Sequence, residues 1–169
     1  WLVSWSMSAS VTDVSPFITE KLKIPAQRED AGRALRGQDV LNLFANWPKG
    51  HTPETAHFAE VAKIFFHIVF FGGLRLGELL GTSDEDPGAK YENLDRERSI
   101  LRLDTSKNGQ WREVALPRFV VDMIPKGNGP MFFGHISDHT LRHYYKMATK
   151  VAGITGRLRL HDGRVTAAT

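Results

Sequence analysis

The stretch that decides the fold is Gly72-Gly73-Leu74-Arg75-Leu76-Gly77-Glu78-Leu79-Leu80. Two glycines interrupt an apolar run, and an arginine and a glutamate follow them three residues apart. Residues 74–80 are predicted to form a short helix on which Arg75 and Glu78 share one face. Taken alone, Arg75 is best explained as a surface residue that pairs with Glu78.

Two helices are predicted before this stretch. Residues 38–46 have apolar side chains at near-helical spacing, and a Trp-Pro-Lys-Gly stop signal follows at residues 47–50. Thr52 is a favourable N-cap, and Pro53 suits the first position of the second helix. From Phe58 to Phe71 apolar residues cover nearly every face of that helix, so it is expected at the centre of the core.

A hairpin and a short helix are predicted after residues 81–88, which read as a loop. Residues 100–105 alternate apolar and polar side chains, as a half-buried strand does. Asn108-Gly109 is a strong two-residue hairpin signal, and residues 110–116 return as the partner strand. Pro117 ends that strand, and residues 119–124 begin the helix.

The last third of the chain is predicted to be helical. Ser137 or Asp138 caps a helix that Gly153 closes. One face of this helix is apolar and is expected to be buried: Leu141, Tyr144, Tyr145, Ala148 and Val151. His161 and Arg164 then lie at i, i+3 on a further helix. The sum is an α+β fold, mainly helical, with a small antiparallel sheet of two to three strands.

Composition limits the classes of protein. A length of 169 residues and a hydrophobic share of 41% fit one packed domain. No cysteine is present, so neither a disulfide nor a thiolate metal site is possible, and no other metal site is expected. The longest apolar run, residues 61–71, contains Lys63 and His67 and is too short for a bilayer span, so no membrane association is expected.

Charge is unevenly distributed although the net charge is only +3. Between His139 and Thr169 the only acidic residue is Asp162. Six basic residues lie in that segment: Arg142, Lys146, Lys150, Arg157, Arg159 and Arg164. Such a cluster is consistent with a polyanion partner, and equally with a solvated helix face.

The ordered set Arg75, Lys107, His161 and Arg164 resembles the catalytic domain of the tyrosine recombinases, the phage integrase family. Residues 72–79 resemble the family's first arginine motif, and Lys107 matches its hairpin lysine, followed by Arg-Glu-Val-Ala-Leu-Pro at residues 112–117. His161-Asp162-Gly163-Arg164 matches its His-x-x-Arg box. The resemblance covers residues 36–169. It implies a partial catalytic domain at residues 26–169, with residues 1–25 a linker or the end of a preceding core-binding domain.

The chain departs from the family pattern at three places. The family has a bulky apolar residue where Gly163 stands, and often a second histidine where Val165 stands. Its third basic residue and its nucleophilic tyrosine follow the His-x-x-Arg box. Tyr91, Tyr144 and Tyr145 all precede the box, and none matches the nucleophile. The resemblance therefore implies a chain that binds DNA without cutting it, and whose nucleophile lies elsewhere.

The resemblance also implies roles for the matched residues. Arg75 and Arg164 bind the non-bridging oxygens of one DNA phosphate. Lys107 protonates the leaving 5′-oxygen, and His161 assists proton transfer or holds the phosphate. Glu78 orients Arg75 or a neighbouring element. No metal or cofactor is required, because several cations and a proton donor suffice for phosphoryl transfer.

Partners follow from the same resemblance. Double-stranded DNA is the expected ligand, contacted by Arg142, Lys146, Lys150 and Arg159. Other recombinase protomers are expected to bind beside it on DNA, and the complete recombinase is expected to form a tetramer there. The 169-residue chain is expected to be a monomer in solution. The expected location is the cytoplasm, at the nucleoid.

Two other functions compete with a recombinase or integrase. One alternative is a non-catalytic DNA-binding remnant of an integrase. This hypothesis rests on the observation that no tyrosine of the chain matches the nucleophile of the family. A third hypothesis is an unrelated helical protein-interaction module that uses the basic helix at residues 141–151. Type IB topoisomerases and telomere resolvases share related chemistry, although the residues of these motifs are more similar to those of integrases.

Overall fold

The structure is a computed structural model that describes residues 34–104, 111–155 and 162–167. Of the last segment, the side chains of Gly163, Thr166 and Ala167 are described. All these residues belong to one compact unit, residues 32–169. The domain boundary predicted after residue 25 lies outside the described residues.

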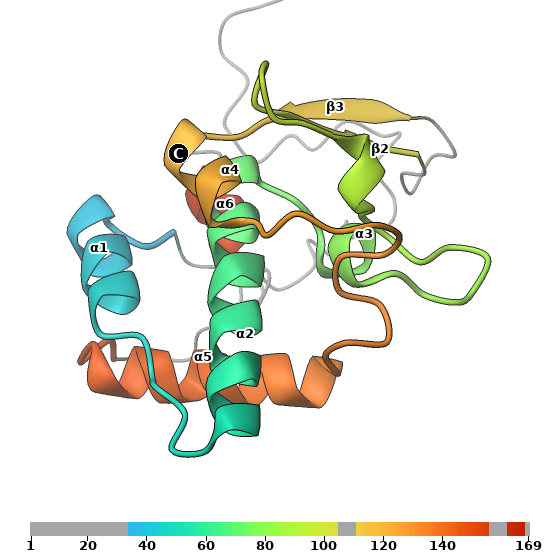
Figure 1. Cartoon of the computed structure of the whole chain (residues 1–169). Coiled ribbons are helices and arrows are strands. Elements are labelled where there is room, and N and C mark those ends of the chain that lie inside the picture. The colour runs from blue at the N-terminus through green and yellow to red at the C-terminus, as the bar shows by residue number, and fades with distance from the viewer. Residues whose placement is uncertain (1–33, 105–110, 156–161, 168–169) are drawn as a thin grey trace, which may run out of the picture. The chain divides into compact units, whose positions relative to one another are not determined.

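The helix α2 (Pro53–Gly72) forms the centre of the fold (Figure 1). Thr52 caps it by accepting a hydrogen bond from the Thr55 backbone N–H, and Pro53 occupies its first turn, as predicted. Gly73 ends it in the left-handed conformation, with φ of 64°. Its second half is buried on nearly every side, from Ile64 to Phe70. The apolar pattern of the sequence therefore marked the core correctly.

The helix α2 is also long and apolar enough, by length and composition alone, to cross a membrane. Half of the 18-residue apolar segment of α2 that could do so is buried inside the domain. Its ring contacts explain that burial: Phe66 stacks on Tyr145 with ring centroids 4.8 Å apart, and Phe65 meets Phe132 edge-on at 5.0 Å. These are the contacts of a core helix, so packing inside the domain explains why α2 is apolar.

A three-stranded antiparallel sheet lies beside the end of α2 (Figure 1). Its strands are β1 (Leu94–Asp95), β2 (Ile100–Leu103) and β3 (Arg112–Ala115), in that order. Leu101 faces Val114, and Leu103 faces Arg112, across the central pair. A Cβ on Gly72 would lie 2.8 Å from the side chain of Leu116, so the helix end and the strand end approach closely. The predicted hairpin is confirmed in both strands, and its turn lies outside the described residues.

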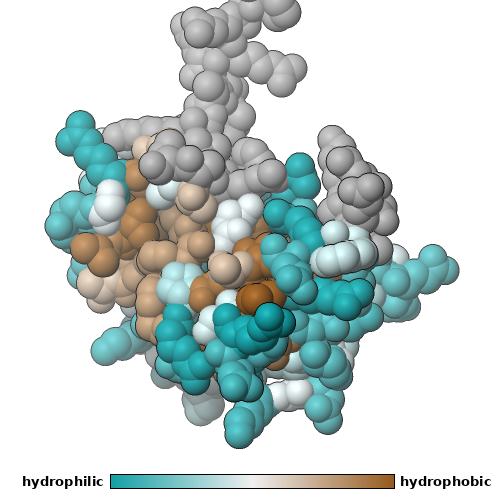
Figure 2. Space-filling view, turned by 90° about the horizontal axis from the view of Figure 1, so that it is seen from above, coloured by the Kyte–Doolittle hydropathy of each residue, from teal (hydrophilic) through white to brown (hydrophobic). Residues whose placement is uncertain are grey.

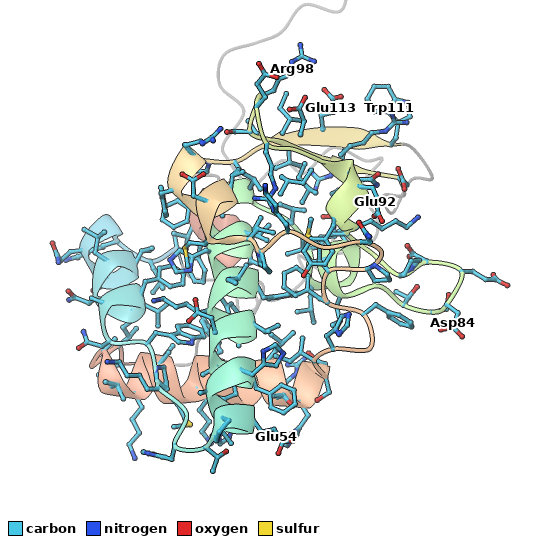
Figure 3. All side chains as sticks on the ribbon, viewed as in Figure 1. Glu54, Asp84, Glu92, Arg98, Trp111 and Glu113 are labelled. Carbon is cyan, nitrogen blue, oxygen red and sulfur yellow. The ribbon has the colours of Figure 1, made fainter. Side chains whose placement is uncertain are left out.

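The outer face of the sheet is polar. Figure 3 shows Arg98, Trp111 and Glu113 pointing away from the body of the domain. Trp111 is 60% exposed, and the guanidinium of Arg102 lies 5.2 Å from its ring centroid. The inner face carries Leu101 and Leu103, which are buried against the core. A short 3₁₀ helix, η1 (Tyr91–Asn93), leads into the sheet.

The helices α1 (Gly37–Ala45) and α5 (Asp138–Val151) pack against each other, and α5 also packs against α2. Ser137 caps α5 by accepting from the Thr140 backbone N–H. The predicted buried face of α5 is confirmed from Leu141 to Ala148. It is wrong for Val151, which is 60% exposed because it is the last residue of the helix and projects beyond the core.

The remaining helices are short. They are α3 (Leu76–Leu80), α4 (Arg118–Met123) and α6 (Asp162–Ala167). Viewed from above, apolar atoms gather on one part of the surface and hydrophilic atoms cover much of the rest (Figure 2). The large exposed apolar side chains of the domain include Leu41 on α1 and Phe119 on α4.

The helix α6 packs against α2 through Gly163. Gly163 is buried, and a Cβ on it would lie 2.8 Å from Val69 Cγ1 and 3.1 Å from the ring of Phe70. The departure from the family's bulky residue thus has a packing reason, because the aromatic side of α2 already fills this space. At the other end of α6, Thr166 Oγ1 accepts a 3.0 Å hydrogen bond from the Leu35 backbone N–H.

Candidate functional site

Arg75 occupies the N-cap position of α3, immediately after the turn that ends α2. Its backbone is extended, with φ of −79° and ψ of 151°. The predicted helix over residues 74–80 is therefore too long by two residues, because Arg75 stands before the first helical turn. Leu74 is buried beside it and fixes the connection between the two helices. The Arg75 side chain is 40% exposed, so part of it faces solvent.

Glu78 binds Arg75 twice. Its Oε2 accepts from the Arg75 backbone N–H at 2.7 Å, as the third helical residue does in a capping box. Its Oε1 accepts from Arg75 Nη1 at 3.0 Å. The Glu78 side chain is only 6% exposed. A buried carboxylate that holds both the backbone and the side chain restricts the Arg75 guanidinium more than a solvated pair would.

Arg112, the first residue of β3, reaches the same carboxylate. Its Nη2 donates to Glu78 Oε2 at 2.6 Å, across 34 residues of sequence. Its side chain is 35% exposed. The two arginines thus share one buried carboxylate, and the three groups together carry a net charge of about +1. Arg112 is not among the site residues predicted from the sequence.

The ionisation of Glu78 follows from these contacts. Burial alone raises the pKa of this carboxyl. The hydrogen bonds from Arg75 and Arg112 and the charge of Arg112 together outweigh burial, so the pKa lies below its ordinary value of 4.5. Glu78 is consequently ionised at neutral pH.

The helix α6 approaches the C-terminal end of α2. A Cβ on Gly73 would lie 3.4 Å from the Cβ of Ala167, and Gly73 is two residues before Arg75. The helix α6 includes Arg164, whose side chain is not among those described. Lys107 and His161 also lie outside the described residues. Their predicted convergence with Arg75 therefore stays a prediction.

The predicted DNA-binding residues of α5 are exposed. Arg142, Lys146 and Lys150 lie on its outer side, four residues apart. Arg142 Nε donates to Asp138 Oδ2 at 2.8 Å, so part of its charge is already neutralised. Arg159 lies outside the described residues. The role of these four residues in DNA binding stays a prediction.

Two of the three tyrosines of the chain are buried in the core. Tyr144 and Tyr145 are 7% and 4% exposed. Tyr144 Oη donates to the Thr55 backbone carbonyl at 2.8 Å, and burial raises its pKa. Tyr91 is half-buried and packs against Gly127. Within residues 34–104, 111–155 and 162–167, no group of acidic or histidine side chains could hold a metal ion.

Comparisons with known structures define the fold. The chain matches the catalytic domain of bacteriophage HP1 integrase with a TM-score of 0.55 and 18% identity, over 82% of this chain and 70% of that one. It matches XerA recombinase with a TM-score of 0.58 and 18% identity, over 80% of this chain and 48% of that one. The chain therefore has the fold of tyrosine recombinase catalytic domains, as the motifs predicted.

Sequence comparison adds one local similarity. No family model matches the chain. A segment of 71 residues, 40% of this chain, is 42% identical to part of the highly reducing polyketide synthase tstA of Talaromyces stipitatus. The chain spans 3% of the length of that protein. So short a match gives no ground for assigning polyketide chemistry to this chain.

Proposed function

We propose that this chain is the catalytic domain of a site-specific recombinase or integrase that breaks and rejoins duplex DNA. The single observation that carries the proposal is Arg75, which a buried carboxylate holds at the start of α3 while part of its side chain stays exposed. The neighbouring ends of α6 and β3 support it, because they bring the Arg164 helix and the hairpin strand to the same region.

In the proposed reaction Arg75 and Arg164 donate hydrogen bonds to the non-bridging oxygens of one phosphodiester. They stabilise the negative charge that increases on those oxygens in the transition state. A tyrosine hydroxyl attacks phosphorus, the bond to the 5′-oxygen breaks, and Lys107 protonates the leaving oxygen. His161 assists proton transfer or holds the phosphate. The 3′-phosphotyrosyl link keeps the bond energy, so attack by another 5′-hydroxyl releases the tyrosine and rejoins the strands.

The nucleophile of this reaction is none of the three tyrosines present, since two are buried in the core and the third packs against a neighbouring loop. The same observation supports a second candidate function, a domain that binds DNA without cutting it. Both candidates take duplex DNA as partner and the nucleoid as location. Further protomers on DNA belong to the first candidate, whereas the chain alone is a monomer.

The test uses the 169-residue chain and inorganic phosphate. Arginine side-chain NMR follows the Nε–Hε signals of Arg75 and Arg164 during a phosphate titration. We expect both signals to shift with one shared dissociation constant, and Arg75→Ala to abolish the shift of Arg164. Independent dissociation constants, or no shift at Arg75 at any phosphate concentration, would contradict a common site.

The two candidate functions separate in an assay for a covalent protein–DNA adduct. A recombinase forms a covalent protein–DNA adduct on a nicked duplex, and Arg75→Ala prevents it while most of the DNA affinity remains. A binding domain gives no adduct with or without the substitution.

A further inference from the structure

We infer that Arg112 is a positioning residue for Arg75, acting through Glu78; this inference rests on the proposed role of Arg75 as a phosphate ligand. Arg112 is linked to Arg75 through Glu78. It touches the oxygen of Glu78 that also accepts the Arg75 backbone N–H, at 2.6 Å and 2.7 Å respectively. A displacement of Glu78 would therefore change the Arg75 backbone and side chain together.

The first reason for a role beyond packing is charge. A carboxylate paired with Arg75 alone would cancel its positive charge, and an arginine so neutralised attracts a phosphate poorly. With Arg112 on the same carboxylate, the cluster keeps a charge of about +1 beside the exposed part of Arg75. Glu78 can then fix the geometry of Arg75 without removing the attraction for an anion.

The second reason is the direction of the Arg112 donors. Nη2 is bound to Glu78, and Nε is buried without a partner among the described residues. Arg112 is opposite Leu103 in the sheet and lies in phase with the buried Val114, so its side chain starts from the inner face. Nη2 is thus engaged by Glu78 and Nε faces the protein interior, which favours an indirect role over a direct phosphate contact.

Strand β3 gives this indirect role a fixed base. Arg112 is paired with Leu103 in the β-ladder, so its backbone position is set by the sheet and not by a loop. The segment between Leu103 and Arg112 contains Lys107. A rigid strand therefore links the hairpin to the arginine site through one side chain.

The test measures how the affinity of the 169-residue chain for a mixed-sequence DNA duplex depends on NaCl concentration. On B-DNA the slope of log affinity against log salt has a magnitude of about 0.9 for each phosphate that the protein neutralises. We expect Arg75→Ala to reduce the magnitude of the slope by about 0.9, and Arg112→Gln to reduce it by a similar amount. Arg112→Lys should keep the slope close to that of the unchanged chain, because the charge next to Glu78 is retained.

The deciding variant is the double substitution Glu78→Gln with Arg112→Gln. A glutamine can still accept the Arg75 backbone N–H, and it no longer neutralises the guanidinium. We expect the double variant to recover the slope that Arg112→Gln alone reduces. No recovery, or a slope lower than that of Glu78→Gln alone, would show that Arg112 contacts phosphate itself or acts only on stability, and would overturn the inference.

Two comparisons keep the outcomes separate. If Arg75→Ala leaves the slope unchanged, Arg75 is not a phosphate ligand, and both the proposed function and the inference fail. If Arg75→Ala reduces the slope and folded Arg112→Gln does not, only the inference fails. Should Arg112→Gln alone prove unfolded by circular dichroism, Glu78→Gln and the double variant are compared with each other, and equal slopes are the expected result.

Discussion

Gly163 and Val69 are in direct backbone-to-side-chain contact, since a Cβ added to Gly163 would lie 2.8 Å from Val69 Cγ1. This contact sets how closely α6 approaches α2. Because α6 includes Arg164 and ends beside Gly73, the same contact determines where α6 lies relative to the end of α2. A position that differs from the family pattern therefore has a structural role in this chain.

Replacing Gly163 with leucine, the kind of residue the family has here, should destabilise this chain. An overpacked core position costs about 1–3 kcal/mol. Urea denaturation measures the effect, with Gly37→Ala on α1 as the control, because a Cβ on Gly37 meets nothing within 4 Å. Gly163→Ala should be tolerated better when Val69→Ala is present. Additive effects of those two substitutions would contradict the contact.

The stability that Glu78 contributes should disappear at acid pH. Burial raises its pKa, but the hydrogen bonds from Arg75 and Arg112 lower it below 4.5 overall. A folded-state pKa below the unfolded value gives stability that is complete above about pH 4.5 and is lost as pH falls through the lowered pKa. The difference in unfolding free energy between the unchanged chain and Glu78→Gln should therefore shrink below pH 4.5. A difference independent of pH would contradict the ionised pair.

Tyr144→Phe should loosen the attachment of α5 to the start of α2. The substitution removes the 2.8 Å hydrogen bond from Tyr144 Oη to the Thr55 carbonyl, which costs about 0.5–1.5 kcal/mol. Thermal unfolding measures it. Tyr91→Phe is the matched control, because no hydrogen bond joins the Tyr91 hydroxyl to a described residue. Equal melting temperatures of the two variants would count against the role of this bond.

The raised pKa of Tyr144 has its own consequence at alkaline pH. Burial keeps the Tyr144 phenol neutral in the folded chain at pH values above 10, the ordinary pKa of tyrosine. Its contribution to stability is thus present below pH 10 and is lost as pH rises through the folded-state pKa. The alkaline fall in unfolding free energy should be shallower in Tyr144→Phe, and an identical fall would contradict the assignment.

If α5 binds DNA phosphates, Lys146 and Lys150 should matter more than Arg142. Arg142 already pairs with Asp138, whereas both lysines are exposed. Lys150→Ala should reduce the magnitude of the salt slope of DNA binding by about 0.9, Arg142→Ala by less, and Asp138→Asn should increase it. Lys126, an exposed lysine in the loop after α4, serves as the control. Equal effects of Lys150→Ala and Lys126→Ala would argue against a specific role of α5.

Much of this fold was predictable because its signals are local. The N-cap Thr52, the glycines after α2 and the alternating strands each depend on neighbours within a few residues. Strand β1 was not identified by any pattern. It has two residues, too few to show a period, and it exists through its pairing with β2.

The site was predictable in its residue types and not in its connections. Glu78 was expected to orient Arg75 or a neighbouring element; the two residues are in contact, and the orienting role stays a prediction. The contact with Arg112 spans 34 residues and depends on how the sheet packs against α3. One signal was available: Arg112 falls in phase with the apolar Val114 and Leu116, which marks an arginine on the buried face of a strand.

The most direct test of the central claim is a crystal structure of this chain bound to a DNA duplex. We predict that Arg75, Lys107, His161 and Arg164 surround one phosphate, with Arg75 still held by Glu78. If Arg75 and Arg164 contact different phosphates, or if either points away from the DNA, the chain has the recombinase fold without its active site.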